Sequence, residues 1–218
     1  KAGYKWVSES DTEVLLAAIS HYGWQVLDRC EGMWALAVYN SDDGSLTLCR
    51  DRFGEKPLYI FRDDSGMYFG SEIKFIAALL GHNIEINIEQ IYRYMVNGYK
   101  ALYKQGQTFF KGVSELKSSS LLYVNAQGDE SIRTYWEPKF DPNEDMSYPE
   151  AVNGVREKMI RSVNLRLRSD VPLAFCMSGG IDSNALISIA KREFGYDVHG
   201  FTIVNTDERY EEQDMVEH

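Results

Sequence analysis

The sequence predicts an α/β protein whose amino-terminal half is of the α+β type. Short runs of β-branched and aromatic residues alternate with turn residues there, which indicates antiparallel hairpins. Other segments carry apolar residues at helical spacing. Towards the carboxyl end, a strand, a glycine loop, a helix and a second strand follow one another, as in a parallel α/β sheet.

The elements of the amino-terminal half can be predicted in order. Ser10 and Glu13 form a capping box at the start of the first helix, and Gly23 marks its end. Turn residues then predict three strand pairs, 33–39 with 46–49, 58–61 with 67–69, and 121–124 with 132–136. Helical spacing predicts two further helices at 72–80 and 88–96.

A polar segment with two prolines, 137–147, is predicted to be a domain linker. We therefore expect one domain at 1–136 and a second at 148–218. Beyond the linker, 148–168 has the pattern of a long amphipathic helix. Its predicted buried side consists of Val152, Val155, Met159, Val163 and Leu167.

The most specific motif is SGGIDS at 178–183, between an apolar run at 171–177 and a helical segment at 184–191. Adjacent glycines let the backbone approach an anion, and amides at a helix N-terminus would face it. The carboxylate of Asp182 fits such a site if a divalent cation bridges it to phosphate oxygens. The motif predicts a magnesium–pyrophosphate site. The alternative is an ordinary strand-to-helix turn that Ser183 or Asp182 caps.

The helix after this motif is expected to stop at Gly195, and 197–204 is predicted to be the second strand. This arrangement places the candidate site at the carboxyl end of the first strand, where open α/β sheets bind ligands.

The motif resembles the SGGxDS pyrophosphate loop of adenylate-forming ATP pyrophosphatases, and 168–172 resembles its lead-in in asparagine synthetases. Segments of the amino-terminal half resemble, in order, the class II glutamine amidotransferase domain of glutamine-dependent asparagine synthetases: 10–16, 31–37, 50–59 and 70–74. The resemblance implies an incomplete class II amidotransferase (Ntn-type) sandwich. The start of a parallel-sheet adenine-nucleotide α-hydrolase-like domain would follow it.

The resemblance also implies an activity. Such an enzyme uses ATP and Mg²⁺ to adenylate a carboxylate, aspartate or a related acid, and amidates it with ammonia from glutamine. The implied partners are glutamine and aspartate or another carboxylate acceptor, and a homodimer is compatible with the family.

Site residues follow from the same resemblance. The residues implied to hold pyrophosphate are Ser178, Gly179, Gly180, Asp182 and Ser183, with Asp182 acting through magnesium. Cys176 and Ile203 match adenine contacts, for which an ordinary place in a strand core is the alternative. Asp11 matches the residue that holds the α-amino group of glutamine, and its alternative is helix capping beside Ser10. Arg52 and Lys56 are basic residues in a turn and receive no role.

The family's amino-terminal cysteine nucleophile and its Asn-Gly-Glu block are not found in this sequence. We therefore assign no catalytic residue and expect the chain to be an internal piece of a longer enzyme. Three alternatives stay open. They are an amidotransferase for a surface-polysaccharide sugar acid, suggested by 94–104, a β-lactam synthetase-like adenylating enzyme without glutaminase activity, and a non-catalytic ATP-binding remnant.

Composition excludes some classes of partner. A formal net charge of −10 over 218 residues argues against nucleic acid, because affinity for phosphate backbones depends on Lys and Arg. No apolar run approaches the roughly 20 residues that cross a bilayer, so we predict a cytoplasmic protein without a membrane partner. Cys30, Cys49 and Cys176 have no metal-like spacing and are predicted to be reduced, small buried residues. No protein-bound metal site is predicted.

Overall fold

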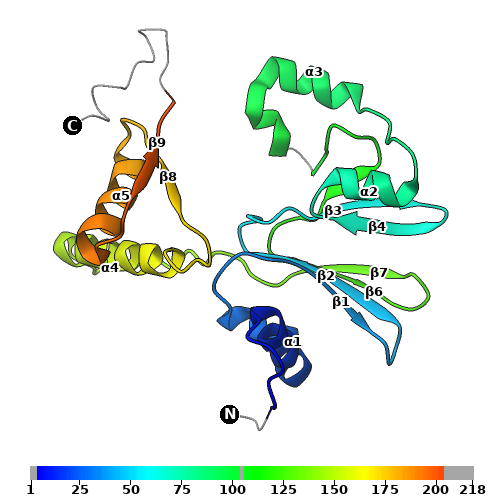
Figure 1. The fold of residues 1–218 in the computed structure, drawn as a ribbon, viewed down its shortest axis with the longest axis horizontal. Helices are drawn as coiled ribbons and strands as arrows, with labels where there is room; N and C mark the ends of the chain where they lie inside the picture. Colours follow the sequence, from blue (N-terminus) through cyan, green and yellow to red (C-terminus); the bar gives the residue numbers. More distant parts are fainter. Residues whose placement is uncertain (1–3, 104–105, 204–218) are drawn as a thin grey trace. The chain divides into compact units, whose positions relative to one another are not determined.

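A computed structural model describes residues 4–103 and 106–203. The chain divides into two compact units, Lys1–Phe140 and Asp141–His218. The first unit contains two antiparallel sheets, and the second contains a parallel strand pair with two helices (Figure 1). No helix in the described part of the chain is long and apolar enough to cross a membrane.

The sheets of the first unit are both antiparallel. The larger has the order β1 (Ala35–Asn40), β2 (Ser45–Arg50), β6 (Ser120–Val124) and β7 (Glu130–Thr134). The smaller has the order β4 (Gly66–Gly70), β3 (Tyr59–Asp63) and β5 (Val113–Glu115). The helical elements are α1 (Asp11–Tyr22), η1 (Trp24–Arg29), α2 (Ile73–Leu80), α3 (Ile88–Asn97) and η2 (Gly98–Tyr103).

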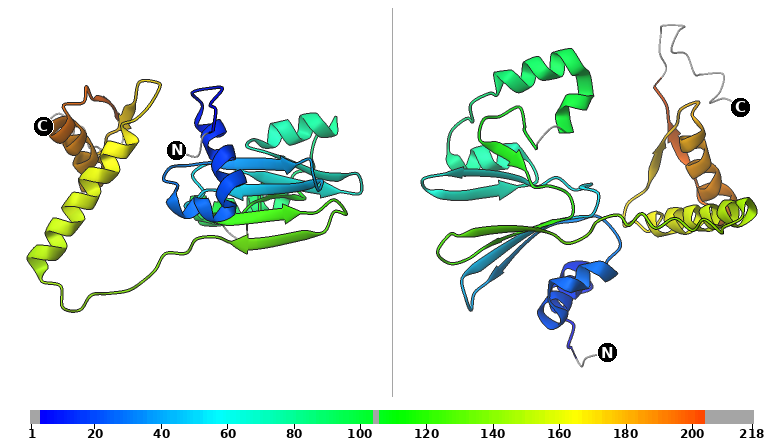
Figure 2. Two further views of the ribbon diagram at one scale, coloured as in Figure 1. Left: turned by 90° about the horizontal axis from the view of Figure 1, so that it is seen from below. Right: turned by 180° about the vertical axis from the view of Figure 1, so that it is seen from behind.

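Alternating side chains arrange these elements in layers. In β2, Leu48 packs between the two sheets, whereas the next residue, Cys49, packs on the opposite face with η1. Successive side chains of a strand point to opposite faces, so one strand serves two cores. Ile76 of α2 and Val113 of β5 form a third core on the outer face of the smaller sheet. The unit is therefore an α/β/β/α sandwich (Figure 2).

The three predicted hairpins are confirmed, with strand bounds shifted by at most two residues. The helices predicted at 72–80 and 88–96 are α2 and α3. Sequence patterns did not predict β5, η1 or η2. Each of these is short, and β5 pairs with β3, more than 50 residues earlier in the chain.

The start of α1 was predicted only in part. Ser10 is the N-cap, as expected, and its hydroxyl accepts the N–H of Thr12 at 3.2 Å. The predicted capping box is wrong, because Glu13 does not accept the N–H of Ser10. Its carboxylate instead accepts the backbone N–H groups of Val7 and Ser8 at 2.9 and 2.7 Å. The extended segment before the helix therefore supplies the donors that a capping box would have used.

The second unit begins with α4 (Tyr148–Arg166), where Ser147 and Glu150 form a complete capping box. It continues with β8 (Ala174–Cys176), α5 (Ile181–Phe194) and β9 (His199–Phe201), and β8 and β9 are parallel. Gly195 ends α5 in the left-handed conformation, as predicted. Of the strand predicted at 197–204, Val204 lies outside the described residues.

The prediction of a buried side for α4 is largely wrong. Val163 is buried and faces Leu173 and Phe175, but Val152 and Val155 are 46% and 58% exposed. Among the described residues, only the carboxyl-terminal part of α4 is covered by other elements. The amino-terminal turns therefore keep their apolar side chains in solvent, although the pattern itself is amphipathic.

Candidate functional site

The SGGIDS motif forms the loop between β8 and α5. The hydroxyl oxygens of Ser178 and Ser183 lie 2.9 Å apart, and the Gly180 N–H donates to Ser178 Oγ at 3.2 Å. A Cβ at position 180 would lie 3.2 Å from that oxygen, so the tight turn favours glycine. Two of the predicted pyrophosphate residues, Ser178 and Ser183, thus lie in direct contact with each other.

The amino-terminal end of α5 presents backbone amides beside the loop. Gly180 is the N-cap, and no side chain caps the helix among the described residues. The Ser183 hydroxyl instead donates hydrogen bonds to the carbonyl oxygens of Ser178 and Gly180, so it does not cap the helix. Asp182 is exposed in the first turn. Uncapped amides beside an exposed carboxylate fit a phosphate group held together with a divalent cation.

Asn184, in the first turn of α5, supports the loop and was missed by sequence patterns. Its Nδ2 donates to the carbonyl oxygens of Ser178 and Gly180 at 3.1 and 3.0 Å. It lies one residue beyond the motif, and only its place within the first turns of the helix could have suggested the contact. These two bonds fix the loop's carbonyl groups from the helix side.

The predicted adenine contacts lie at the same edge as the loop. Cys176 pairs with Phe201, and the Met177 N–H donates to the Phe201 carbonyl at 2.7 Å, so the ends of β8 and β9 are adjacent. Cys176 is exposed and Ile203 is 92% exposed. The prediction that Cys176 is buried is therefore wrong, because too little of the described unit covers this short sheet.

Asp11 lies in a pocket of about 710 Å³ in the first unit. It is the first residue of α1, while Ser10 caps the helix, so the capping alternative for Asp11 is not what the structure shows. The pocket is lined by one side of α1, by 30–36 and by two residues from other segments, Lys56 and Ser71. Asp11 and Lys56 thus bring opposite charges to one cavity.

Neither thiol near this pocket is activated. Cys30 lines the pocket, and burial raises the pKa of its thiol, an effect that Arg52 partly offsets. Burial also raises the pKa of Cys49 to about 12. Both groups are protonated near neutral pH and are poor nucleophiles.

Arg52 and Lys56 have different surroundings. Arg52 donates to the carbonyl oxygens of Leu27 and Asp28 at 3.1 and 3.0 Å, and its guanidinium lies over the Trp136 ring at 5.6 Å. It therefore joins the end of η1 to Trp136, two residues after the end of β7. Lys56 is exposed and faces the Asp11 pocket.

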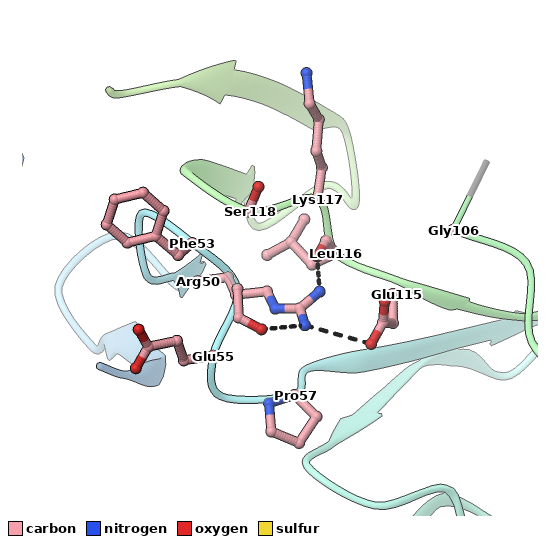
Figure 3. Close-up of a pocket in the computed structure, with 10 residues that line it drawn as sticks. Arg50, Phe53, Glu55, Pro57, Gly106, Glu115, Leu116, Lys117 and Ser118 are labelled. Atoms are coloured by element: carbon pink, nitrogen blue, oxygen red, sulfur yellow. Dashed lines mark hydrogen bonds and ion pairs between the residues drawn. The ribbon is translucent and has the colours of Figure 1, made fainter. Parts of the chain in front are cut away.

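Arg50 holds the loop that carries Lys56. Its guanidinium donates to the carbonyl oxygens of Lys56, Gly54 and Leu116 at 2.8, 2.8 and 2.7 Å. It also pairs with Glu115 at 3.3 Å. Arg50, Gly54, Glu115 and Leu116 line a second pocket of about 730 Å³ (Figure 3). The buried arginine is fully engaged with the protein and has a structural role.

Asp51 holds the same loop through the loop's backbone N–H groups. It is 1% exposed, and its carboxylate accepts the backbone N–H groups of Phe53, Glu55, Lys56 and Trp34. Burial acts to raise the pKa of Asp51, but these four bonds outweigh it and hold the pKa below its ordinary value. Asp51 could not be singled out from the sequence, because a lone aspartate after a strand is a common turn residue.

Comparison with known proteins identifies two family matches. Residues 1–136 match the glutamine amidotransferase domain, and residues 154–218 match asparagine synthase. The glutamine-hydrolyzing asparagine synthetase 1 of Bacillus subtilis is 33% identical over 93% of this chain and 33% of its own length. The glutamine-hydrolyzing asparagine synthetase 3 of the same organism is 32% identical over 88% of this chain and 31% of its own length.

The chain spans about a third of the length of these curated relatives. Among solved structures, the glutamine phosphoribosylpyrophosphate amidotransferase of B. subtilis superposes with a TM-score of 0.40 at 15% identity, over 99% of this chain and 45% of that one. A superposition this loose does not bear on function. With both domain models matched in order, the chain belongs to the family of glutamine-dependent asparagine synthetases, in which a glutamine amidotransferase domain precedes an asparagine synthase domain.

Proposed function

We propose that the protein is a carbon–nitrogen ligase that activates a carboxylate, aspartate or a related acid, with ATP and amidates it with ammonia from glutamine. The observation that carries the proposal is the SGGIDS loop at the carboxyl end of β8, uncapped at the start of α5, in a chain whose first part is an amidotransferase sandwich. The amidotransferase domain would comprise 1–136, the linker 137–147 and the synthetase domain 148–218 onwards.

The synthetase part would bind ATP through the loop. Ser178, Gly179, Gly180 and Ser183 would hold the pyrophosphate group, and Asp182 would hold it through Mg²⁺, which neutralises charge on the leaving group. Cys176 and Ile203 would contact adenine, since both are exposed at the edge of the sheet where the loop lies. The contact between the Ser178 and Ser183 hydroxyls supports a shared role in binding.

The amidotransferase part would bind glutamine in the Asp11 pocket. A carboxylate in the lining of a pocket of about 710 Å³ suits the α-amino group of an amino acid. A homodimer and a cytoplasmic location belong to the same proposal, and light scattering of the purified protein tests the first.

The test uses the full-length protein with ATP, Mg²⁺, aspartate and glutamine. We expect formation of AMP, pyrophosphate and asparagine, and we expect Asp182→Ala to abolish magnesium-dependent ATP binding in calorimetry. Asp141→Ala, an exposed aspartate outside the loop, is the matched control and should bind ATP normally. Unchanged ATP binding by Asp182→Ala would contradict the assignment of the loop, and release of ADP in place of AMP would contradict the adenylation chemistry.

A further inference from the structure

We propose that Asp51 is a positioning residue for the glutamine pocket, an inference that rests on the proposed function of the amidotransferase part. Asp51 does not line the pocket. It acts through Trp34 and Lys56, which do.

The contacts of Asp51 divide between its two carboxylate oxygens. Oδ1 accepts the N–H groups of Phe53 and Glu55 at 3.1 and 3.0 Å. Oδ2 accepts those of Lys56 and Trp34 at 2.9 and 3.3 Å. Charge-assisted bonds of this kind are stronger than neutral ones. A single oxygen atom, Oδ2, therefore connects two chain segments that are distant in sequence.

Both segments are walls of the pocket that contains Asp11. Trp34 belongs to the wall formed by 30–36, and Lys56 is contributed by the loop after β2. The backbone of Asp51 strengthens the link, because its N–H donates to the Trp34 carbonyl at 3.0 Å. The distance between these two walls thus depends on the Asp51 carboxylate.

The loop has other attachments that do not depend on this carboxylate. Arg50 holds the carbonyl groups of Gly54 and Lys56, and the Ser119 N–H donates to the Asp51 carbonyl at 2.9 Å. Replacing Asp51 by asparagine keeps the shape of the side chain but substitutes a donor for one acceptor oxygen, which leaves two N–H groups without their partner. We expect the loop to shift while the sheets keep their structure.

The test compares two nitrogen sources in the full-length protein. Ammonium chloride supplies ammonia without use of the glutamine pocket, so it reports on the synthetase part alone. For Asp51→Asn we expect KM for glutamine to rise about tenfold, because the variant loses buried charge-assisted hydrogen bonds that hold the pocket walls. The kinetic constants with ammonium should stay near those of the wild type. A parallel loss with both nitrogen sources would indicate a purely structural role and would overturn the inference.

Asp43→Asn is the matched control. Asp43 is exposed in the turn between β1 and β2, where its Oδ1 accepts the Ser45 N–H at 2.9 Å, and it does not line the pocket. This variant should keep the wild-type KM for glutamine.

Ser119→Ala gives a second test that leaves Asp51 intact. The Ser119 hydroxyl donates to the Arg52 carbonyl at 2.9 Å, so its loss loosens the same loop. We expect KM for glutamine to rise about threefold. If Asp51→Asn does not fold, an unchanged KM in Ser119→Ala overturns the inference, as does a wild-type KM in folded Asp51→Asn. A wild-type protein that neither binds nor hydrolyses glutamine would overturn the proposed function itself, and this inference with it.

Discussion

Asn184 supports the SGGIDS loop from inside α5. Its two bonds to the loop carbonyls would be lost in Asn184→Ala, and the loop would no longer be fixed for an incoming anion. We expect the Kd for magnesium-bound ATP to rise about tenfold in calorimetry with the full-length protein. Asn153→Ala, at an exposed position of α4, should bind ATP like the wild type. Equal affinity in the two variants would show that the loop holds its shape without this amide.

The ionisation of Asp51 predicts a pH dependence of stability. Its pKa is lowered in the folded protein, so the ionised carboxylate contributes stability above the unfolded pKa of about 3.9. That contribution is lost as the pH falls below this value towards the folded pKa. Asparagine does not titrate. The difference in melting temperature between wild type and Asp51→Asn should therefore be full at pH 7 and narrow below about pH 4. Differential scanning fluorimetry checks this, and a constant difference down to pH 3 would contradict it.

The helices and strands that depend on a local sequence pattern could be predicted from the sequence. The hairpin of β3 and β4 needs only two β-rich runs and the turn that ends at Gly66. In contrast, β5 is three residues long and pairs with a distant strand, so no local pattern indicates it. The predicted burial on α4 was wrong at Val152 and Val155, because burial depends on which elements lie nearby as well as on periodicity.

The same distinction applies to the candidate site. The SGGIDS loop is contiguous, so a sequence pattern could indicate all its members. The pocket around Asp11 combines α1, the segment before β1 and the loop after β2, which meet only after folding. Lys56 and Trp34 could therefore not be assigned to it from the sequence.

The loop after β2 requires a glycine at position 54. Its φ is +68°, and a Cβ there would lie 3.1 Å from Arg50 Cζ and 3.2 Å from Ser118 Cβ. Gly54→Ala therefore adds a steric conflict to the cost of a left-handed residue, which is about 1–2 kcal/mol. Gly128 has a φ of +88° and no atom within 4 Å, so Gly128→Ala carries the backbone cost alone. We expect Gly54→Ala to lower the melting temperature more than Gly128→Ala does. Equal decreases in the two variants would show that the Arg50 side chain moves aside freely.

At the scale of the whole molecule, the two candidate sites would attract their ligands through different interactions. The chain has a formal net charge of −10, and the SGGIDS loop contains no Lys or Arg. Attraction for a polyphosphate would therefore come from backbone amides and from a cation held by Asp182. The Asp11 pocket instead offers side-chain charges of both signs, which would suit a zwitterionic amino acid such as the proposed glutamine. Each unit thus has the chemistry for one of the two proposed substrates.

The segment 137–147 predicts where a protease would separate the two units. All its residues are exposed, and it contains no helix or strand. Proteases need an extended, accessible backbone, so trypsin should cleave after Lys139 early in limited digestion of the full-length protein. Lys158 is equally exposed but lies within α4, and Arg133 lies within β7, so cleavage there should be slower. Mass spectrometry of a digestion time course identifies the cuts. If cleavage after Lys158 or Arg133 occurs earlier in the time course than cleavage after Lys139, other parts of the protein cover the segment. It is then not an exposed linker.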